Sequence, residues 1–457
     1  MTPTYDELLE AVNSLKKENK DLKTELERVR KTSRETAERQ QKEIEGLCRE
    51  LRKYHNENTP SAANKHLKGN TNGLRAKGGK RGAPFGHKGT TRKQVPDEFD
   101  DIDANECPGC HSDDIEDVGV LKRVVEEVPA PVRPKATGAL IHKKRCNNCG
   151  KVFLPPQNEI PLKGKFGINL MILILMMKFV LRGALRKTAS FLQWGFAFAI
   201  TPASVNAIVK RVAEAANSDY EAMKMRVRNS GIVYSDNTSF SVLGVNFWLW
   251  IFRTDKDILL VIRRGKGRNV IREILGRNYT GKVVCDCAWV YNYLKKAIIQ
   301  RCWAHLLRKA KALESIAGRH FYAKLCEMFE EIKKFNESNP TEGERIGRHE
   351  QMTAELSNLV SYYGGYDDAR PVTKYITNHF DQWFTCVRYP GIEPTNNLSE
   401  QGLRESVIYR KIIGAFRSKE GPTYYERLAS LFATWQMRGI DAQVELRKML
   451  ISNLCQS

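Results

Sequence analysis

Residues 231–286 decide the fold of this chain: GIVYSDNTSFSVLGVNFWLWIFRTDKDILLVIRRGKGRNVIREILGRNYTGKVVCD. Three successive stretches, 231–244, 245–253 and 257–264, are rich in the bulky and β-branched residues typical of strands. The middle stretch is apolar on both faces, as a strand covered on both sides should be. A helical stretch around 269–276 then precedes a fourth short strand, 281–286. The order predicts an α/β domain with a central sheet.

Two carboxylates stand at the ends of the first and fourth predicted strands, Asp236 and Asp286. Three strands, a helix and a fourth strand are the opening order of a ribonuclease-H-like fold, in which the first and fourth strands are neighbours. We therefore expect these two side chains to meet. Adjacent carboxylates repel each other unless a divalent cation lies between them. Each aspartate could instead be an ordinary turn acid that ends a strand.

A third carboxylate is expected from a later helix within PTNNLSEQGLRES, residues 394–406. Glu400 is the candidate, and Arg404 lies one turn later, where it would contact a phosphate or steady the carboxylate. Three oxygen ligands suit two Mg²⁺ (or Mn²⁺) ions per active site, which would activate an attacking hydroxyl and stabilise a leaving oxygen. Glu400 could alternatively close a capping box on Asn397.

The composition favours a globular protein that binds a polyanion. At 457 residues the chain is expected to form about two to four units. A net charge of +21 destabilises a compact state unless a partner such as DNA or RNA neutralises it. The longest apolar run, 170–177, is stopped by Lys178 and is too short to span a membrane, which favours a buried helix.

The N-terminal sequence MTPTYDELLE has no apolar stretch of the kind found in signal peptides. We therefore expect a cytoplasmic protein, prokaryotic and nucleoid-associated, without membrane contact. In a reducing compartment the eleven cysteines are candidates for metal ligands or core residues before disulfides.

Residues 1–55 predict a coiled coil that makes the protein at least a dimer. Leu8, Leu15, Leu22 and Val29 recur every seven residues, and this heptad spacing is typical of a seam between two helices. The alternative is a single amphipathic helix that packs on its own chain.

Residues 56–100 form a predicted basic, glycine-rich arm. Its segment KGGKRGAPFGHKGTTRK, residues 77–93, carries many cations and no acid, and it has no apolar periodicity with which to build a core. We interpret it as an arm that follows DNA phosphates or enters a minor groove, although a flexible linker would have a similar composition. The expected DNA-binding cations are Lys77, Lys80, Arg81, Lys88, Arg92 and Lys93.

Residues 101–160 predict a zinc ribbon. The pairs Cys107/Cys110 and Cys146/Cys149 each have the spacing of a metal-binding knuckle, and a short β-hairpin core is expected between them, in 118–142. Four thiolates hold Zn²⁺ tetrahedrally and leave no open position. The predicted role of this Zn²⁺ is therefore structural.

Residues 161–228 are predicted to be helical. Thr201-Pro202 provides an N-cap and first-turn pair, and the preceding helix ends near Gly195. A helix, a short turn and a second helix that carries Lys210 and Arg211 could form a helix-turn-helix that binds DNA. Ordinary packing of two helices is an equally good interpretation.

Three blocks of the chain resemble one known family. They are CDCAWVYN at 285–292, QRCWAHLLRKAKALE at 300–314 and EPTNNLSEQGLRESVIYRKIIGAFRSKEG at 393–421. These blocks resemble the insertion-sequence-66 family of DDE transposases, and the N-terminal coiled coil, the basic arm and the ribbon cysteines extend the similarity over nearly the whole chain. Cys287 and Gly402 depart from the family pattern.

The resemblance implies that Asp236, Asp286 and Glu400 are the catalytic, metal-binding residues, and that Cys302 and His305 support them. The catalytic core would occupy 229–313 and 391–457, with a helical insertion at 314–390. The expected function is metal-dependent cleavage and strand transfer of double-stranded DNA, with the element's terminal inverted repeats and a target as substrates. Accessory proteins of the same element are possible partners.

Two other functions are compatible with these motifs. One is a transposase-derived regulator that binds DNA through the zinc ribbon without catalysis. The other is a structure-specific nuclease of the same fold, which would cleave strands without joining them.

Overall fold

The computed structural model describes residues 16–18, 20–29, 31–32, 35–36, 39, 43, 103–116, 118, 120–121, 133–155 and 159–455. The chain divides into two units, Met1–Glu126 and Glu127–Ser457, and each is treated by itself. The basic arm, with all six of its predicted DNA-binding cations, lies outside the described residues.

In the first unit, every described residue between 16 and 43 is helical and exposed, including Leu22, Leu26 and Val29 of the heptad pattern. Pairing of two such helices stays a prediction.

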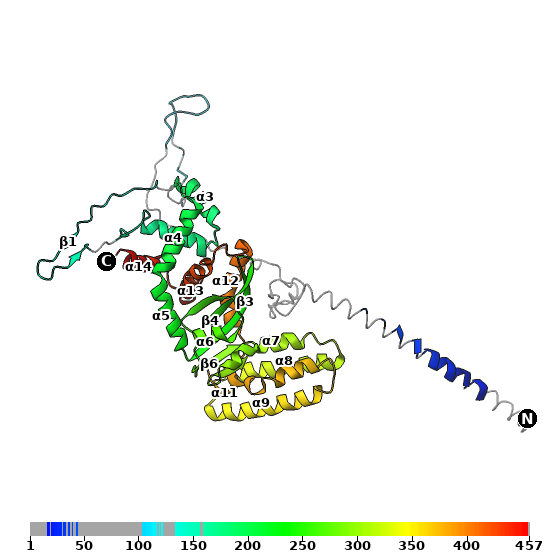
Figure 1. The fold of residues 1–457 in the computed structure, drawn as a ribbon. Helices are drawn as coiled ribbons and strands as arrows, with labels where there is room; N and C mark the ends of the chain where they lie inside the picture. The colour runs from blue at the N-terminus through cyan, green and yellow to red at the C-terminus, as the bar shows by residue number, and fades with distance from the viewer. Residues whose placement is uncertain are drawn as a thin grey trace, which may run out of the picture. The chain divides into compact units, whose positions relative to one another are not determined.

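The second unit contains the helices and strands that build the sheet and its cover (Figure 1). The strands are β1 (Lys144–Arg145), β2 (Val152–Phe153), β3 (Ile232–Val242), β4 (Val245–Arg253), β5 (Ile258–Arg263), β6 (Lys282–Cys285) and β7 (Ile298–Arg301). The helices are α2 (Ile168–Phe179), α3 (Leu185–Phe196), α4 (Pro202–Ala215), α5 (Asn217–Arg228), α6 (Arg268–Ile274), α7 (Trp303–Ala310), α8 (Ile316–Glu337), α9 (Glu342–Tyr363), α10 (Arg370–Thr377), α11 (Thr385–Arg388), α12 (Asn397–Ile413), α13 (Gly421–Arg438) and α14 (Ala442–Leu454), with 3₁₀ helices η2 (Trp289–Tyr293) and η3 (Phe380–Gln382).

The central sheet has the strand order β5-β4-β3-β6-β7. β3, β4 and β5 pair antiparallel, whereas β6 is parallel to both β3 and β7. The predicted adjacency of the first and fourth strands is therefore confirmed. The sequence did not reveal β7, which adds a fifth strand beside β6.

One strand boundary was predicted wrongly. β3 does not end at Asp236 but continues to Val242, because residues 235–242 still pair with β4 across a tight turn at Leu243-Gly244. Both turn residues have positive φ, 51° and 79°, as a two-residue hairpin turn requires. The parallel pairing with β6, however, stops at Tyr234. Asp236 thus lies just beyond the end of the parallel ladder.

Each face of the sheet is covered by helices. On one face, Val233, Trp250 and Leu259 pack with apolar residues of α2, α4, α5, α13 and α14 in one continuous core. On the other face, Ile251 and Leu260 pack beneath α12 and α13. Burial on both faces explains why β4 and β5 are apolar throughout.

The predicted insertion, 314–390, is helical and forms a lobe beside the sheet, which Figure 1 shows as α8, α9 and α11 lying next to α7. Its buried residues, including Phe321, Leu325 and Trp383, form one core with Tyr234 of β3 and Val284 of β6. The lobe is therefore built onto the face of the sheet from which Asp236 projects.

Helix α13 seals the outer edge of β5. An edge strand carries free N–H groups at every second residue, and those of β5 are met by side chains at every fourth residue of α13. These spacings match because two strand residues rise about 6.6 Å and four helical residues about 6 Å. The bonds join Ile258 N–H to Thr434 Oγ1 at 2.9 Å, Leu260 N–H to Ser430 Oγ at 2.8 Å and Ile262 N–H to Glu426 Oε2 at 2.8 Å.

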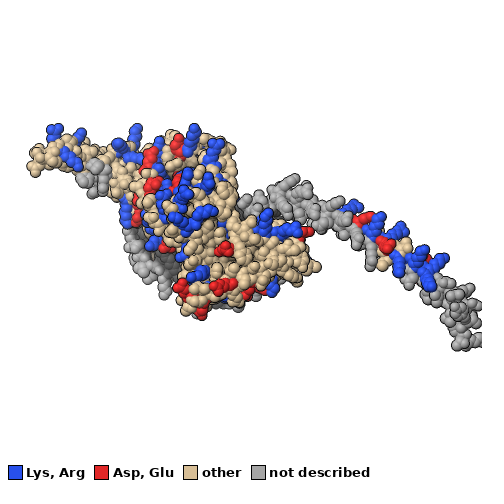
Figure 2. Space-filling model, turned by 60° about the horizontal axis from the view of Figure 1, so that its bottom comes forward, with Lys and Arg blue, Asp and Glu red and all other residues tan. Residues whose placement is uncertain are grey.

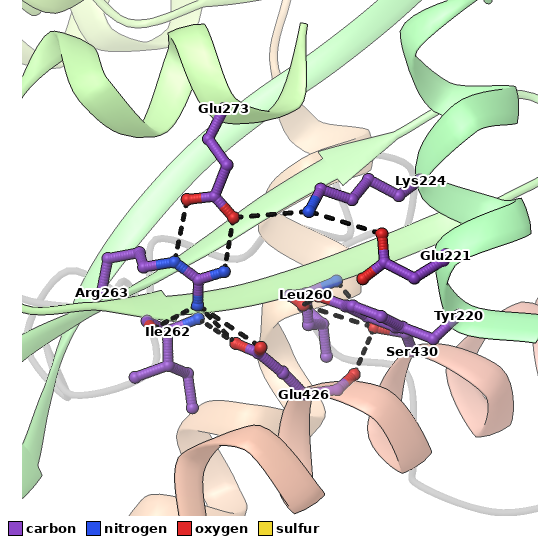
Figure 3. A network of polar contacts seen from close by, with 9 residues as sticks. All are labelled: Tyr220, Glu221, Lys224, Leu260, Ile262, Arg263, Glu273, Glu426 and Ser430. Carbon is purple, nitrogen blue, oxygen red and sulfur yellow. Dashed lines mark hydrogen bonds and ion pairs between the residues drawn. The ribbon is translucent and has the colours of Figure 1, made fainter. Parts of the chain in front are cut away.

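A polar network extends from this edge to α6 (Figure 3). Arg263 of β5 donates to Glu426 at 3.0 Å and to both carboxylate oxygens of Glu273, at 3.0 and 2.6 Å. Glu273 also pairs with Lys224 of α5 at 3.5 Å. Burial raises the pKa of Glu426, against the opposing effect of Arg263, whereas the hydrogen bond from Arg263 lowers the pKa of Glu273. The network fixes α6 to the sheet.

The helical region before the sheet agrees with its sequence pattern. Thr201 caps α4, its hydroxyl accepting the Ser204 N–H at 3.1 Å, and α3 and α4 lie where two helices were expected. The apolar run 170–177 lies within α2 and contributes buried residues to the core. Among the described helices, none is long and apolar enough to cross a membrane.

Candidate active site

Asp236 and Asp286 stand at equivalent positions of neighbouring parallel strands. The register pairs Tyr234 with Val284, so the two aspartates each lie two residues beyond this pair. Side chains two residues apart point to the same face of a sheet. Both carboxylates therefore project from the face that carries the helical lobe, at the ends of neighbouring parallel strands.

The electrostatics of Asp236 report how close its neighbours are. Burial, the charge of Asp286 and, more weakly, the charge of Glu400 raise the pKa of Asp236 to about 7, although its carboxylate accepts the Asn237 N–H at 2.8 Å. Asp286 accepts the Ala288 N–H at 3.0 Å. The three carboxylates thus share one electrostatic environment in which the like charges are unfavourable.

Glu400 reaches this environment because the start of α12 is tied to the sheet. The Asn396 side chain donates to Ser235 O at 2.8 Å, one residue before Asp236, and the Asn396 N–H contacts Cys302 Sγ at 3.1 Å. From β4, Arg253 donates to Leu398 O at 2.7 Å. These contacts hold the first turn of α12 against the strand that carries Asp236.

The capping alternative for Glu400 is not observed. The N-cap of α12 is Asn396 rather than Asn397, and the Asn396 side chain accepts no hydrogen bond from the first turn. Instead, Glu400 Oε1 lies 3.8 Å from Arg308 Nη2 of α7. Glu400 keeps about a third of its side chain exposed, so it remains accessible to a ligand.

Gly402, which interrupts the family pattern, has a packing role. A Cβ atom added there would lie 2.4 Å from Cδ1 of Ile251, a fully buried residue of β4. The absence of a side chain therefore lets α12 approach the sheet closely. This gain in packing opposes the low helix propensity of glycine.

Arg301 fixes the loop that carries Asp286. Its fully buried guanidinium donates to Asp286 O at 2.6 Å, to Asn292 Oδ1 at 2.7 Å and to Gln382 Oε1 at 2.7 Å. A buried cation that satisfies several acceptors orders the loop around it. The position of Asp286 thus depends on a residue of β7.

The residues predicted to support the site have different surroundings. Cys302 is buried at the start of α7, and burial raises the pKa of its thiol to about 11, so it is a neutral packing residue beneath α12. His305 lies partly buried in the first turn of α7. Arg404 is exposed, and no hydrogen bond or ion pair joins its described side chain to Glu400.

The donor set at this site is suited to a hard divalent cation. Carboxylates that raise one another's pKa are stabilised when such a cation binds between them. Among the residues that the structure describes, no group of three or more His, Cys, Asp and Glu side chains is already arranged to hold a metal. Glu400 faces Arg308 instead.

The ribbon cysteines form two knuckles of the same design. In each, the first cysteine N–H bonds to a carbonyl five residues on, at 2.9 Å for Cys107 and 2.8 Å for Cys146. Hydrogen bonds from backbone groups of each knuckle and from its second cysteine lower the pKa of Cys107 and Cys146. Among the described residues of 118–142 there is no strand, and the hairpin β1–β2 instead flanks the second knuckle.

The two described DNA-binding candidates differ in exposure. Lys210 is exposed, and its Nζ lies 3.8 Å from Glu214. Arg211 is partly buried, its guanidinium lies over the backbone of Gly164, and burial lowers its pKa. Lys210 is therefore the better placed of the two to contact a phosphate.

Sequence reasoning missed three residues that position the carboxylates, namely Arg301, Asn396 and Arg308. Each lies inside a quoted block, but its role depends on contacts with distant segments. A polar residue in an otherwise apolar strand end was the available signal for Arg301.

The comparisons with known proteins concern most of the second unit. A family model described as the transposase IS66 family matches residues 163–424, more than half of the chain. The matched range includes the whole sheet, Asp236, Asp286 and Glu400. A comparison with curated proteins finds no match to this chain.

Proposed function

Because the chain belongs to the transposase IS66 family, we propose that it cleaves DNA at the terminal inverted repeats of an insertion sequence and transfers the freed strands to target DNA. The catalytic residues would be Asp236, Asp286 and Glu400, carried by a core of ribonuclease-H-like topology. The observation that carries this proposal is the placement of Asp236 and Asp286 two residues beyond the same register pair of β3 and β6, with the start of α12 tied to β3 beside Asp236.

The three carboxylates would hold two Mg²⁺ or Mn²⁺ ions. When bound, such ions activate the attacking hydroxyl and stabilise the leaving oxygen. Asn396, Arg253 and Cys302 keep Glu400 near β3, and Arg301 keeps Asp286 in place. Arg308 lies 3.8 Å from the Glu400 carboxylate and would be available to a DNA phosphate if Glu400 held a metal.

DNA binding would use basic surfaces outside the carboxylates. On the face drawn in Figure 2, Lys and Arg side chains gather into a broad cluster on the compact body, with Asp and Glu side chains scattered beside it and along the bottom of the view. The predicted basic arm, 56–100, and Lys210 would add phosphate contacts. Two equivalent knuckles support a structural Zn²⁺ held by Cys107, Cys110, Cys146 and Cys149.

The test uses the full chain with Mg²⁺ or Mn²⁺ and DNA that carries the element's ends. The wild type is expected to nick the ends and join them to target DNA. Asp236→Asn, Asp286→Asn and Glu400→Gln are each expected to lower strand transfer by at least about 100-fold, because metal stabilisation of the transition state is worth several kcal/mol. Asp255→Asn, an exposed carboxylate in the β4–β5 turn, is the matched control and should retain activity.

The same assay separates the alternatives. Binding without cleavage would identify a regulator, and cleavage without joining a nuclease. Full strand transfer by all three carboxylate variants would show that the assigned residues are wrong.

A further inference from the structure

A basic pocket lies between α6 and η2, the 3₁₀ helix that follows Asp286 in the chain. Its volume is about 550 Å³. We call it the α6–η2 pocket. Its lining residues are Arg268, Arg272, Arg277, Trp289, Asn292, Tyr293 and Lys295. Four of its residues are cations and none is an acid.

The cations of the α6–η2 pocket are not neutralised by the protein. Arg268, Arg272, Arg277 and Lys295 are exposed, and among the described side chains none forms an ion pair with them. Arg263, by contrast, is close in sequence and binds both Glu273 and Glu426. Four unpaired cations around one cavity attract a ligand with several negative charges, such as a run of phosphates.

The pocket also presents an aromatic surface. Trp289 exposes 66% of its surface, whereas the next two residues, Val290 and Tyr291, are almost fully buried. Tyr291 donates to Ser235 Oγ at 3.0 Å. The indole is therefore held in solvent by a firmly anchored 3₁₀ helix, which is the arrangement on which a nucleobase can stack.

The pocket is mechanically linked to Asp286. The Arg301 guanidinium that binds Asp286 O also binds the side chain of Asn292, a lining residue. On the other wall, Glu273 of α6 is fixed by Arg263. Trp289 itself follows Asp286 by three positions. A ligand seated in the pocket would thus have a defined position relative to the carboxylates.

We propose that the α6–η2 pocket binds an unpaired nucleotide of the DNA strand next to the reacting phosphate. The base stacks on Trp289, and the flanking phosphates contact Arg268, Arg272, Arg277 and Lys295. The pocket thereby favours DNA whose strands are separated beside the cleavage position. This inference rests on the proposed function of the Asp286 site.

The test measures affinity by fluorescence anisotropy, with full-length protein and without divalent cations, so that no cleavage is needed. The probes are a short duplex with a single-stranded extension and the same duplex with blunt ends. The wild type should bind the extended duplex more tightly. Trp289→Ala should remove about 10-fold of that preference, the scale of one base–aromatic stack, and Trp289→Phe should retain part of it.

Matched controls separate the pocket from general effects. Tyr362→Ala removes an equally exposed aromatic residue of α9 and should leave the preference unchanged. Arg272→Gln should lower the salt dependence of binding, with a slope smaller by about 1, whereas Arg319→Gln, an exposed cation of α8, should not. Equal loss of affinity for both duplexes in Trp289→Ala, or no loss, would overturn the proposal.

Two further comparisons complete the test. A preference restricted to DNA that ends in the terminal repeat assigns the nucleotide to the element, and a preference on any sequence assigns it to the target. If wild-type protein shows the Trp289-dependent preference but never cleaves DNA, the proposed function fails while the pocket stands. If cleavage occurs without the preference, the pocket proposal alone fails.

Discussion

At the scale of single residues, the carboxylates of the site repel one another, and a bound cation would relieve this repulsion. Burial on β3 disfavours the ionised form of Asp236, and the negative charges of Asp286 and Glu400 disfavour it further. Among the described side chains none forms an ion pair with Asp236, and Lys266 only weakly opposes the rise of its pKa, whereas Asp257, a buried carboxylate nearby in sequence, has two arginine partners. Such an uncompensated carboxylate is typical of functional rather than structural acids.

This arrangement predicts a pH-dependent stability in the metal-free protein. The pKa of Asp236 rises from 3.8 to about 7 on folding, so the folded state binds the proton more tightly than the unfolded state between these values. Its contribution to stability is therefore greatest at low pH and declines as the pH rises from about 4 to about 7. Thermal unfolding midpoints of wild type and Asp236→Asn should diverge over this range, with the variant the more stable at pH 8.

The other titrating groups are common to both proteins. The difference between their unfolding midpoints therefore reports the titration of Asp236 alone. Mg²⁺ added at pH 8 should raise the midpoint of the wild type and have little effect on the variant. A difference between the two midpoints that stays constant from pH 4 to pH 8 would contradict the account.

At the scale of elements, the closeness of α12 to the sheet sets the position of Glu400. Gly402 permits this approach, and Arg253 and Asn396 tie the first turn to β4 and β3. The sequence marks Gly402 only as a departure from the family pattern. The structure shows that a side chain at this position would collide with Ile251, which no local pattern reveals.

Gly402→Ala should therefore destabilise the protein although alanine favours helices. The added methyl group forces Ile251 or α12 to move, and overpacking of a core typically costs about 1–3 kcal/mol. Gly347→Ala is the matched control, since Gly347 lies exposed within α9 with no neighbour near its Cβ position. That change should stabilise by about 0.5–1 kcal/mol. Urea unfolding of both variants measures the contrast.

Removing Cδ1 of Ile251 should restore the space. Gly402→Ala combined with Ile251→Val is expected to lose less stability than the two single changes added together, and to recover part of the strand-transfer activity. Additive losses would mean that Gly402 does not act through Ile251.

Much of the element order could be predicted from sequence because each strand and helix carries its own local pattern. The adjacency of β3 and β6, the cap at Thr201 and the helical insertion all follow the predictions. The end of β3 was predicted wrongly, because residues 235–242 belong to a hairpin and the polar residues among them resemble a loop. Arg301 and Asn396 were missed because their roles arise only when segments far apart in sequence meet.

At the scale of the whole molecule, charge and metal content are the properties that a single preparation can report. The chain carries a net charge of +21, and the proposed sites assign cation binding to the carboxylates and phosphate binding to the α6–η2 pocket. The two cysteine pairs add a predicted Zn²⁺ whose presence can be measured directly.

Purified full-length protein is accordingly expected to contain one Zn²⁺ per chain. Cys146→Ser should lose the metal, because three thiolates and a hydroxyl hold Zn²⁺ far less well than four thiolates. Cys326→Ser, a partly buried cysteine of α8, is the control and should retain it. Elemental analysis after gel filtration gives the ratio, and a metal-free wild type would exclude the ribbon.

The cover over the outer strands of the sheet has a consequence for how copies of this protein can associate. Glu426, Ser430 and Thr434 occupy the donors of β5, and on the opposite edge Thr385 donates to Ile299 O at 2.7 Å. The edge of β5 therefore lacks the free N–H groups through which one sheet continues into another. If two copies associate, we expect them to do so through surfaces other than this edge.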